Sequence, residues 1–81
     1  MKQYTIRYTR RNRTTEVTDT LENLIQYFSY TLECGRCYQN ERGNKRIDTA
    51  PKSARSLVAN LNNAERNRSA NGDPSTVYSL A

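Results

Sequence analysis

Apolar and polar side chains alternate without interruption over residues 3–9. Tyr4, Ile6 and Tyr8 fall on one side of an extended chain, and the polar residues between them fall on the other. A period of two in β-favouring residues predicts a half-buried strand. Residues 10–13 form a polar turn and residues 14–18 can return as a second strand, so we expect an N-terminal hairpin with a cationic tip.

After the hairpin the apolar positions change to helical spacing. The stripe is the strongest in the chain and consists of Leu21, Leu24, Ile25, Phe28 and Leu32. We predict a helix over residues 20–33, capped by Asp19 or Thr18, with Glu22 completing a capping box. Gly35 lies just past the expected end, where glycine commonly terminates a helix.

Residues 36–48 allow two interpretations. Residues 36–39 and 45–47 can be short strands around a turn at residues 41–44, or the whole stretch can be an ordered loop. No periodic pattern distinguishes the two, so both stay open.

The rest of the chain predicts a second helix and a closing strand. Thr49 can cap this helix, with Pro51 tolerated in its first turn. Residues 71–74 are a strong turn signal, and residues 75–80 have the pattern of a strand. The apolar stripe of the helix is narrow and consists of Ala54, Leu57, Val58, Leu61 and Ala64.

The order of elements is thus β-β-α-(ββ or loop)-α-β, in a single domain spanning residues 1–81. We predict an α+β fold with a small, mainly antiparallel sheet, made of the N-terminal hairpin and the C-terminal strand, and two helices packed on one face. Hydrophobic residues make up only 35% of the chain. Burial is therefore limited, and a homo-oligomer or a bound partner can complete it.

The charge is strongly basic. Thirteen lysines and arginines against eight acidic residues give a formal net charge of +5, and only three of the thirteen are lysines. Arginine binds phosphate with a planar fork and stacks on flat rings, so this bias favours a nucleic-acid partner. The same charge also suits a basic surface that is merely solvated.

Arginines and tyrosines lie close together in the hairpin, in the middle segment and near the second helix. Single-stranded nucleic acid needs cations for its phosphates and flat rings for its bases. At strand spacing, however, Tyr4 and Tyr8 are more typical of a core than of a stacking surface. We predict a nucleic-acid-binding site made of Arg7, Arg10, Arg11, Arg13, Arg36, Tyr38, Arg42, Lys45, Arg46, Lys52, Arg55 and Arg66.

Cys34 and Cys37 form the one motif with metal or redox potential. A C-x-x-C pair is half of a four-ligand zinc site, and with no histidine or second pair a complete site would need two chains. Redox pairs sit at a helix N-terminus, whereas this pair follows a predicted helix end. We expect reduced cysteines, no metal and no cofactor; an intersubunit metal or a redox-switched dimer is the lesser alternative.

Catalysis is not expected from this composition. The chain has no histidine, the side chain best suited to proton transfer at neutral pH, and no glycine-rich phosphate loop or nucleophile elbow. It also has no signal peptide and no apolar run of roughly 20 residues. We therefore expect a cytoplasmic binding protein rather than an enzyme.

In size, basic charge and richness in tyrosine and asparagine, the chain resembles the small accessory proteins of tailed phages, especially the T-even group. These proteins are made early to disarm host defences. Between residues 36 and 66 the chain is similar to the RNA-binding antagonists of the ToxN ribonuclease toxin. The resemblance implies a protein of the host cytoplasm that binds host or toxin-associated RNA together with the toxin, and it is compatible with an anti-CRISPR or anti-restriction role.

The functional prediction is a small basic RNA-binding accessory protein that inhibits a host defence factor such as a toxin ribonuclease. The alternative is a protein–protein inhibitor whose basic face covers an acidic or nucleic-acid-binding surface of a host protein. RNA or another single-stranded nucleic acid is the first expected partner and a host toxin or defence protein the second. No membrane partner is expected.

Overall fold

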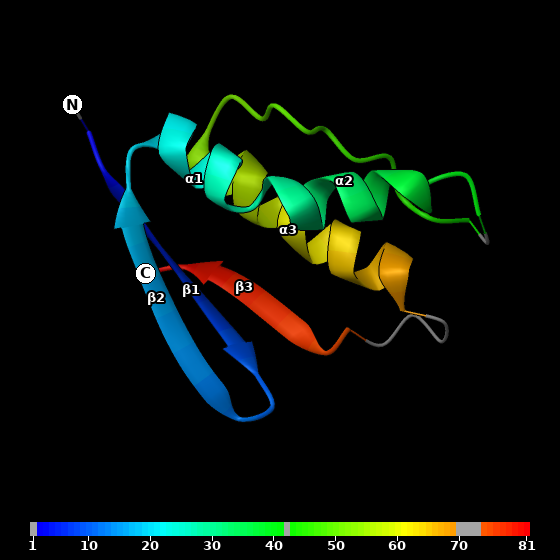
Figure 1. Ribbon diagram of the computed structural model, residues 1–81, viewed down its shortest axis with the longest axis horizontal. Helices are drawn as coiled ribbons and strands as arrows, with labels where there is room; N and C mark the ends of the chain where they lie inside the picture. Colours follow the sequence, from blue (N-terminus) through cyan, green and yellow to red (C-terminus); the bar gives the residue numbers. More distant parts are fainter. Residues whose placement is uncertain (1, 42, 70–73) are drawn as a thin grey trace.

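The computed structural model describes residues 2–41, 43–69 and 74–81, which form three strands and three helices. In chain order these are β1 (Tyr4–Arg10), β2 (Arg13–Asp19), α1 (Leu21–Tyr27), α2 (Ser29–Cys37), α3 (Ala54–Arg68) and β3 (Thr76–Leu80). The antiparallel sheet has the order β2-β1-β3, and the helices cover one of its faces (Figure 1). The predicted α+β fold, in which the C-terminal strand joins the N-terminal hairpin, is confirmed.

The register turns the apolar side of β1 and β3 toward the helices. Ile6 pairs with Leu80, and Tyr8 pairs with Tyr78. Tyr4 and Tyr8 are partly buried against the core, as their alternation with polar residues predicted. The buried core consists of Ile6, Leu24, Phe28, Leu32, Ile47, Leu57, Leu61, Ala64 and Tyr78. Most of these residues come from the two predicted helical stripes.

The single helix predicted over residues 20–33 is wrong in detail, because two helices meet at Phe28. There the backbone departs from helical geometry (φ −99°, ψ 12°), and the buried ring lies edge-on against Tyr8 and Tyr78, with centroids 5.8 and 5.7 Å away. The cap of α1 is Thr20, one residue beyond Asp19. Asp19 instead accepts hydrogen bonds from the Asn23 side chain (2.9 Å) and the Thr20 amide (2.8 Å), which lower its pKa.

Gly35 does not terminate a helix, contrary to the prediction. It lies inside α2, which continues to Cys37, and it is buried. A Cβ on this residue would collide with Cβ and Cα of Ala64 on α3. The glycine is therefore required by the close approach of α2 and α3, a long-range contact that the local sequence does not reveal.

Residues 38–53 connect α2 to α3, and no strand forms in the described part of this stretch, so the loop interpretation is the correct one. Thr49 is not the cap of α3. The helix begins at Ala54, and the Ser53 hydroxyl accepts the Ser56 amide at 3.0 Å. Pro51 is buried ahead of the helix rather than within its first turn.

Carboxamide side chains hold this loop where strand partners are missing. The buried Asn67 of α3 accepts the Lys45 amide (3.1 Å) and donates to the carbonyls of Lys45 (2.7 Å) and Gly35 (3.2 Å). Gln39 accepts the Ile47 amide at 3.1 Å, in the same manner. Backbone groups that would otherwise be unpaired near the core are thus satisfied by side chains.

A further carboxamide fixes the outer edge of the sheet. Asn62 on α3 accepts the backbone amide of Tyr78 at 2.8 Å and donates to its carbonyl at 3.0 Å. The pair of bonds copies what a neighbouring strand would make. It joins α3 to β3 directly.

We predict that Gly35→Ala lowers the free energy of unfolding by about 1–3 kcal/mol, because the added methyl overpacks the contact between α2 and α3. Urea denaturation measures the loss. The matched control is the double variant Gly35→Ala/Ala64→Gly, which vacates the space and should recover part of the stability. If Gly35→Ala is as stable as the natural protein, the close approach of the helices is wrong.

A second prediction concerns alkaline pH. Burial, followed by the nearby Glu65 carboxylate, raises the pKa of Tyr78 above its ordinary 10.0. Because the folded-state pKa is the higher one, the contribution to stability is complete below about pH 10 and is lost as pH rises through the folded-state value.

The free energy of unfolding should therefore fall less over this pH range in Tyr78→Phe, whose ring cannot ionise. Urea denaturation at a series of alkaline pH values measures this dependence. Tyr30→Phe, at a position that is 74% exposed, serves as the control and should retain the natural pH dependence. An unchanged alkaline loss in Tyr78→Phe would contradict the prediction.

Candidate nucleic-acid interface

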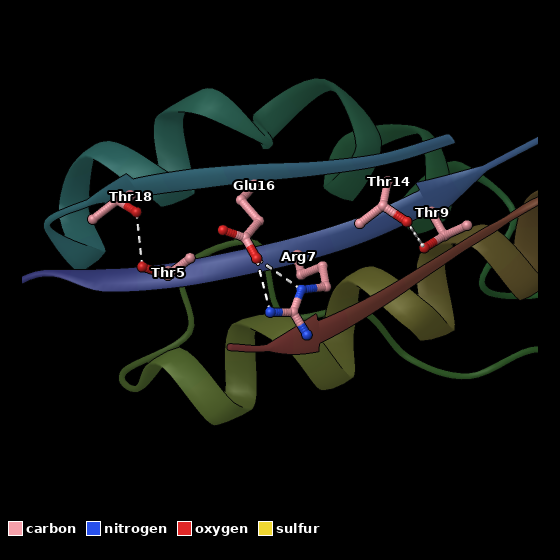
Figure 2. Close-up of polar contacts among 6 residues, drawn as sticks. All are labelled: Thr5, Arg7, Thr9, Thr14, Glu16 and Thr18. Atoms are coloured by element: carbon pink, nitrogen blue, oxygen red, sulfur yellow. Dashed lines mark hydrogen bonds and ion pairs between the residues drawn. The ribbon is translucent and has the colours of Figure 1, made fainter. Parts of the chain in front are cut away.

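The open face of the sheet is polar and internally paired (Figure 2). The hydroxyls of Thr5 and Thr18 lie 2.7 Å apart, and Arg7 binds Glu16 through Nε and Nη2, both at 2.8 Å. No aromatic side chain of the three strands points to this face, since the tyrosines of β1 and β3 share the helix side. This face therefore provides no stacking platform. It also separates Arg7 from the other hairpin arginines of the predicted site.

The remaining hairpin arginines gather where the hairpin extends beyond the helices (Figure 1). Arg10 and Arg13 are cross-strand partners on the helix side, and Arg11 lies in the turn between them. The Nε of Arg10 donates to the Thr76 hydroxyl at 2.9 Å. Because Thr76 is fully buried, this bond fixes the direction of the Arg10 side chain.

Two clefts flank these arginines and share Arg10 and Arg11. The first, of about 390 Å³, lies between the turn, the end of α3 and the start of β3, and the second, of about 420 Å³, lies along the hairpin. We call the two clefts together the hairpin-end surface. The first is lined by Arg10, Arg11, Glu65, Arg68, Ser69 and Ser75, and the second by Tyr8, Arg10, Arg11, Arg13 and Thr15.

The charge of the hairpin-end surface is largely uncompensated. Arg11 and Arg13 form no ion pair with any carboxylate in the described part of the chain. Arg68 is the exception, because its Nη1 binds Glu65 at 3.0 Å. Among the described residues of this surface, four guanidinium groups thus accompany one carboxylate, which makes the surface suitable for an anionic ligand.

Exposed aromatic rings lie next to this surface. Tyr27 is 59% exposed, and its ring packs on Phe28 at a centroid distance of 4.9 Å. The Tyr27 hydroxyl is close enough to Tyr8 to contribute, after burial, to a raised pKa of the Tyr8 phenol. Tyr8 in turn lines the second cleft, so arginines and an exposed ring belong to one continuous surface.

Arg68 and Glu65 were missing from the predicted site. The apolar pattern of the helix weakens at its C-terminal end, so it gives no sign that these residues face a cleft. Their spacing of three residues, which suits a helix ion pair, was the only local signal. Their closeness to the hairpin is a long-range contact.

The other predicted residues lie elsewhere. Arg36 and Arg46 line a third cleft of about 660 Å³, but Asp48 shares its wall and Arg36 is already paired with Glu33 at 2.8 Å. Tyr38 follows α2 and is 41% exposed. This cleft carries less free positive charge than the hairpin-end surface.

The predicted residues near α3 do not form one cluster. Lys52 and Arg55 lie at its N-terminal end, and Arg66 lies eleven residues after Arg55, or about 16 Å along the axis. All three are exposed, as is Lys45 in the loop, and none lines any of the three clefts. Arg42 of the predicted site lies outside the described residues.

The cysteines occupy the last turn of α2 rather than following a helix, which corrects their predicted position. Cys34 is half-buried, Cys37 is exposed, and both are free thiols. Within the residues that the structure describes, no three potential ligands come together to hold a metal ion. The C-terminal end of a helix does not favour a thiolate.

Comparisons of the chain with protein-family models, with curated proteins and with solved structures find no match. Among the described residues, no helix is both long enough and apolar enough to cross a membrane.

The turn of the hairpin carries backbone strain at an arginine. Arg11 (φ 52°) and Asn12 (φ 65°) both adopt the left-handed conformation of a two-residue type I′ turn. Asn-Gly and Asp-Gly are preferred there, and a residue with a large side chain loses roughly 1 kcal/mol in this conformation. The sequence therefore places a guanidinium at the tip at a cost in stability.

We predict that the double variant Arg11→Asn/Asn12→Gly raises the free energy of unfolding by about 1 kcal/mol, because both residues then tolerate the turn. Urea denaturation measures the gain. Arg55→Asn removes the same charge from an exposed site and is the control, with no gain expected. A double variant no more stable than this control would mean that the turn is not strained.

Proposed function

We propose that the hairpin-end surface binds single-stranded RNA. The observation that carries the proposal is Arg11, which occupies a strained turn position, lines both clefts and has no carboxylate partner among the described residues. Strain at an exposed residue is typical of a position that serves binding. The double variant Arg11→Asn/Asn12→Gly, although more stable, should therefore bind RNA more weakly than the natural protein.

The chemistry of the surface suits a single strand better than a duplex. Arg11 and Arg13 can bind phosphate oxygens with their planar guanidinium groups, while the exposed ring of Tyr27 can stack on a base. A duplex hides its base faces, and the ring would then find no partner. The open sheet face, with its paired Arg7 and Glu16, takes no part in this mode.

The proposal predicts measurable affinity for labelled single-stranded RNA, tested by fluorescence anisotropy across a salt series with protein stripped of nucleic acid. Two phosphate contacts, by Arg11 and Arg13, give a slope of log K against log[salt] of about −1.4. Arg13→Glu should weaken binding roughly tenfold and make the slope shallower by about one, because it removes a phosphate contact.

Arg55→Glu is the matched control for this experiment. It changes net charge by the same amount, but Arg55 lies on α3 and lines none of the three clefts. Its affinity for RNA should stay within a few-fold of that of the natural protein. Equal losses in both variants would indicate a general charge effect, and absence of binding at low salt would overturn the proposal.

A protein partner is the second candidate, and an exposed tyrosine favours it. Tyrosine and arginine are the residues most often found at the centres of protein interfaces. Tyr27 is 59% exposed and adjoins Tyr8, which lines the second cleft together with Arg11 and Arg13. An inhibitor that covers an acidic surface should form a stoichiometric complex that survives nuclease treatment, whereas an RNA-bridged complex should dissociate.

A further inference from the structure

The first cleft contains a feature that phosphate binding does not explain. Glu65 lines it and is only 5% exposed, and the other described residues of the wall are arginines and serines. One carboxylate oxygen accepts the bond from Arg68 at 3.0 Å. A carboxylate has about four acceptor sites, so it can accept further hydrogen bonds from a ligand in the cleft.

The Glu65 side of this cleft is less suited to phosphate than the arginine side. Glu65 carries a negative charge there, and the carbonyl end of α3 adds a partial negative charge. The arginines stand beside it, with Arg10 fixed by Thr76 and Arg68 fixed by Glu65. The best ligand is therefore a neutral group that presents hydrogen-bond donors to Glu65 and acceptors to an arginine.

Among the RNA bases, guanine presents this pattern. Its N1–H and N2–H₂ are adjacent donors that match the two oxygens of one carboxylate. Its O6 and N7 are the acceptors that arginine binds with its fork. Adenine, cytosine and uracil offer no pair of adjacent donors on one edge. The volume of about 390 Å³ lies in the range of small-ligand sites, roughly 300–1,000 Å³.

We propose that the cleft between the hairpin turn, the end of α3 and the start of β3 is a guanine-binding subsite. Glu65 accepts N1–H and N2–H₂, and Arg10 or Arg68 donates to O6. The inference rests on the proposed function, since it assigns a base preference to the same RNA-binding surface. Phosphates then lie at the rim, on Arg11 and Arg13.

The test compares labelled uridine-rich RNA oligonucleotides that differ only at one central position, which is guanine, adenine or inosine. Guanine should bind roughly tenfold tighter than adenine. Inosine lacks the N2 amino group and should fall between them. Equal affinities would overturn the guanine subsite while leaving RNA binding intact, whereas failure of every oligonucleotide to bind would overturn the proposed function itself.

Glu65→Gln provides an independent readout. It removes a full negative charge from the group that faces N1–H and N2–H₂, so the guanine-to-adenine affinity ratio should fall toward one. Glu33→Gln is the matched control, because Glu33 forms the same i,i+3 pair with Arg36 on the exposed surface of α2. A ratio unchanged in Glu65→Gln would overturn the subsite.

Loss of the buried carboxylate can also unfold the protein, which a thermal melt of Glu65→Gln would reveal. In that case the natural protein decides the question through competition. Guanosine monophosphate should displace the bound RNA at roughly tenfold lower concentration than adenosine monophosphate. Equal displacement by the two nucleotides would overturn the subsite.

Discussion

One buried side-chain amide organises the helical layer. Asn67 binds backbone groups of α2 and of the connecting loop from its position on α3, and it is only 1% exposed. The close contact of Gly35 with Ala64 brings the two helices near enough for these bonds. Without them, a long loop would have to satisfy its backbone groups beside the core. The position of α3, and with it one wall of the first cleft, depends on this arrangement.

The spacing of apolar residues correctly predicted the strand and helix faces that are buried in the core. The alternation around Ile6 and the stripe around Leu57 both point to the core that forms. The errors come from contacts that no local pattern encodes. Gly35 has the usual position of a helix terminator but serves helix packing. In the described part of the loop after α2, the Asn67 side chain pairs with backbone groups that a strand would otherwise pair.

The sequence predicted which kinds of residue form the candidate site, but not which particular residues come together there. The alternation that correctly oriented Tyr8 also places Arg7 on the opposite face from Arg10, so their separation followed from the strand itself. The addition of Arg68 and Glu65 did not. Those residues reach the hairpin only because β3 returns beside β1 and brings the end of α3 with it. Charged surface residues have no regular spacing along the chain, so the sequence alone does not show which arginines line the same cleft.

The bonds between Asn62 and Tyr78 make the two edges of the sheet, β3 and β2, unequal. At β3 an amide already occupies the middle of the exposed rim, so an incoming chain would have to displace two hydrogen bonds. At β2, a seven-residue strand, the described residues include no such cover. Growth of the sheet by another polypeptide, in assembly or in aggregation, is thereby directed to one side only.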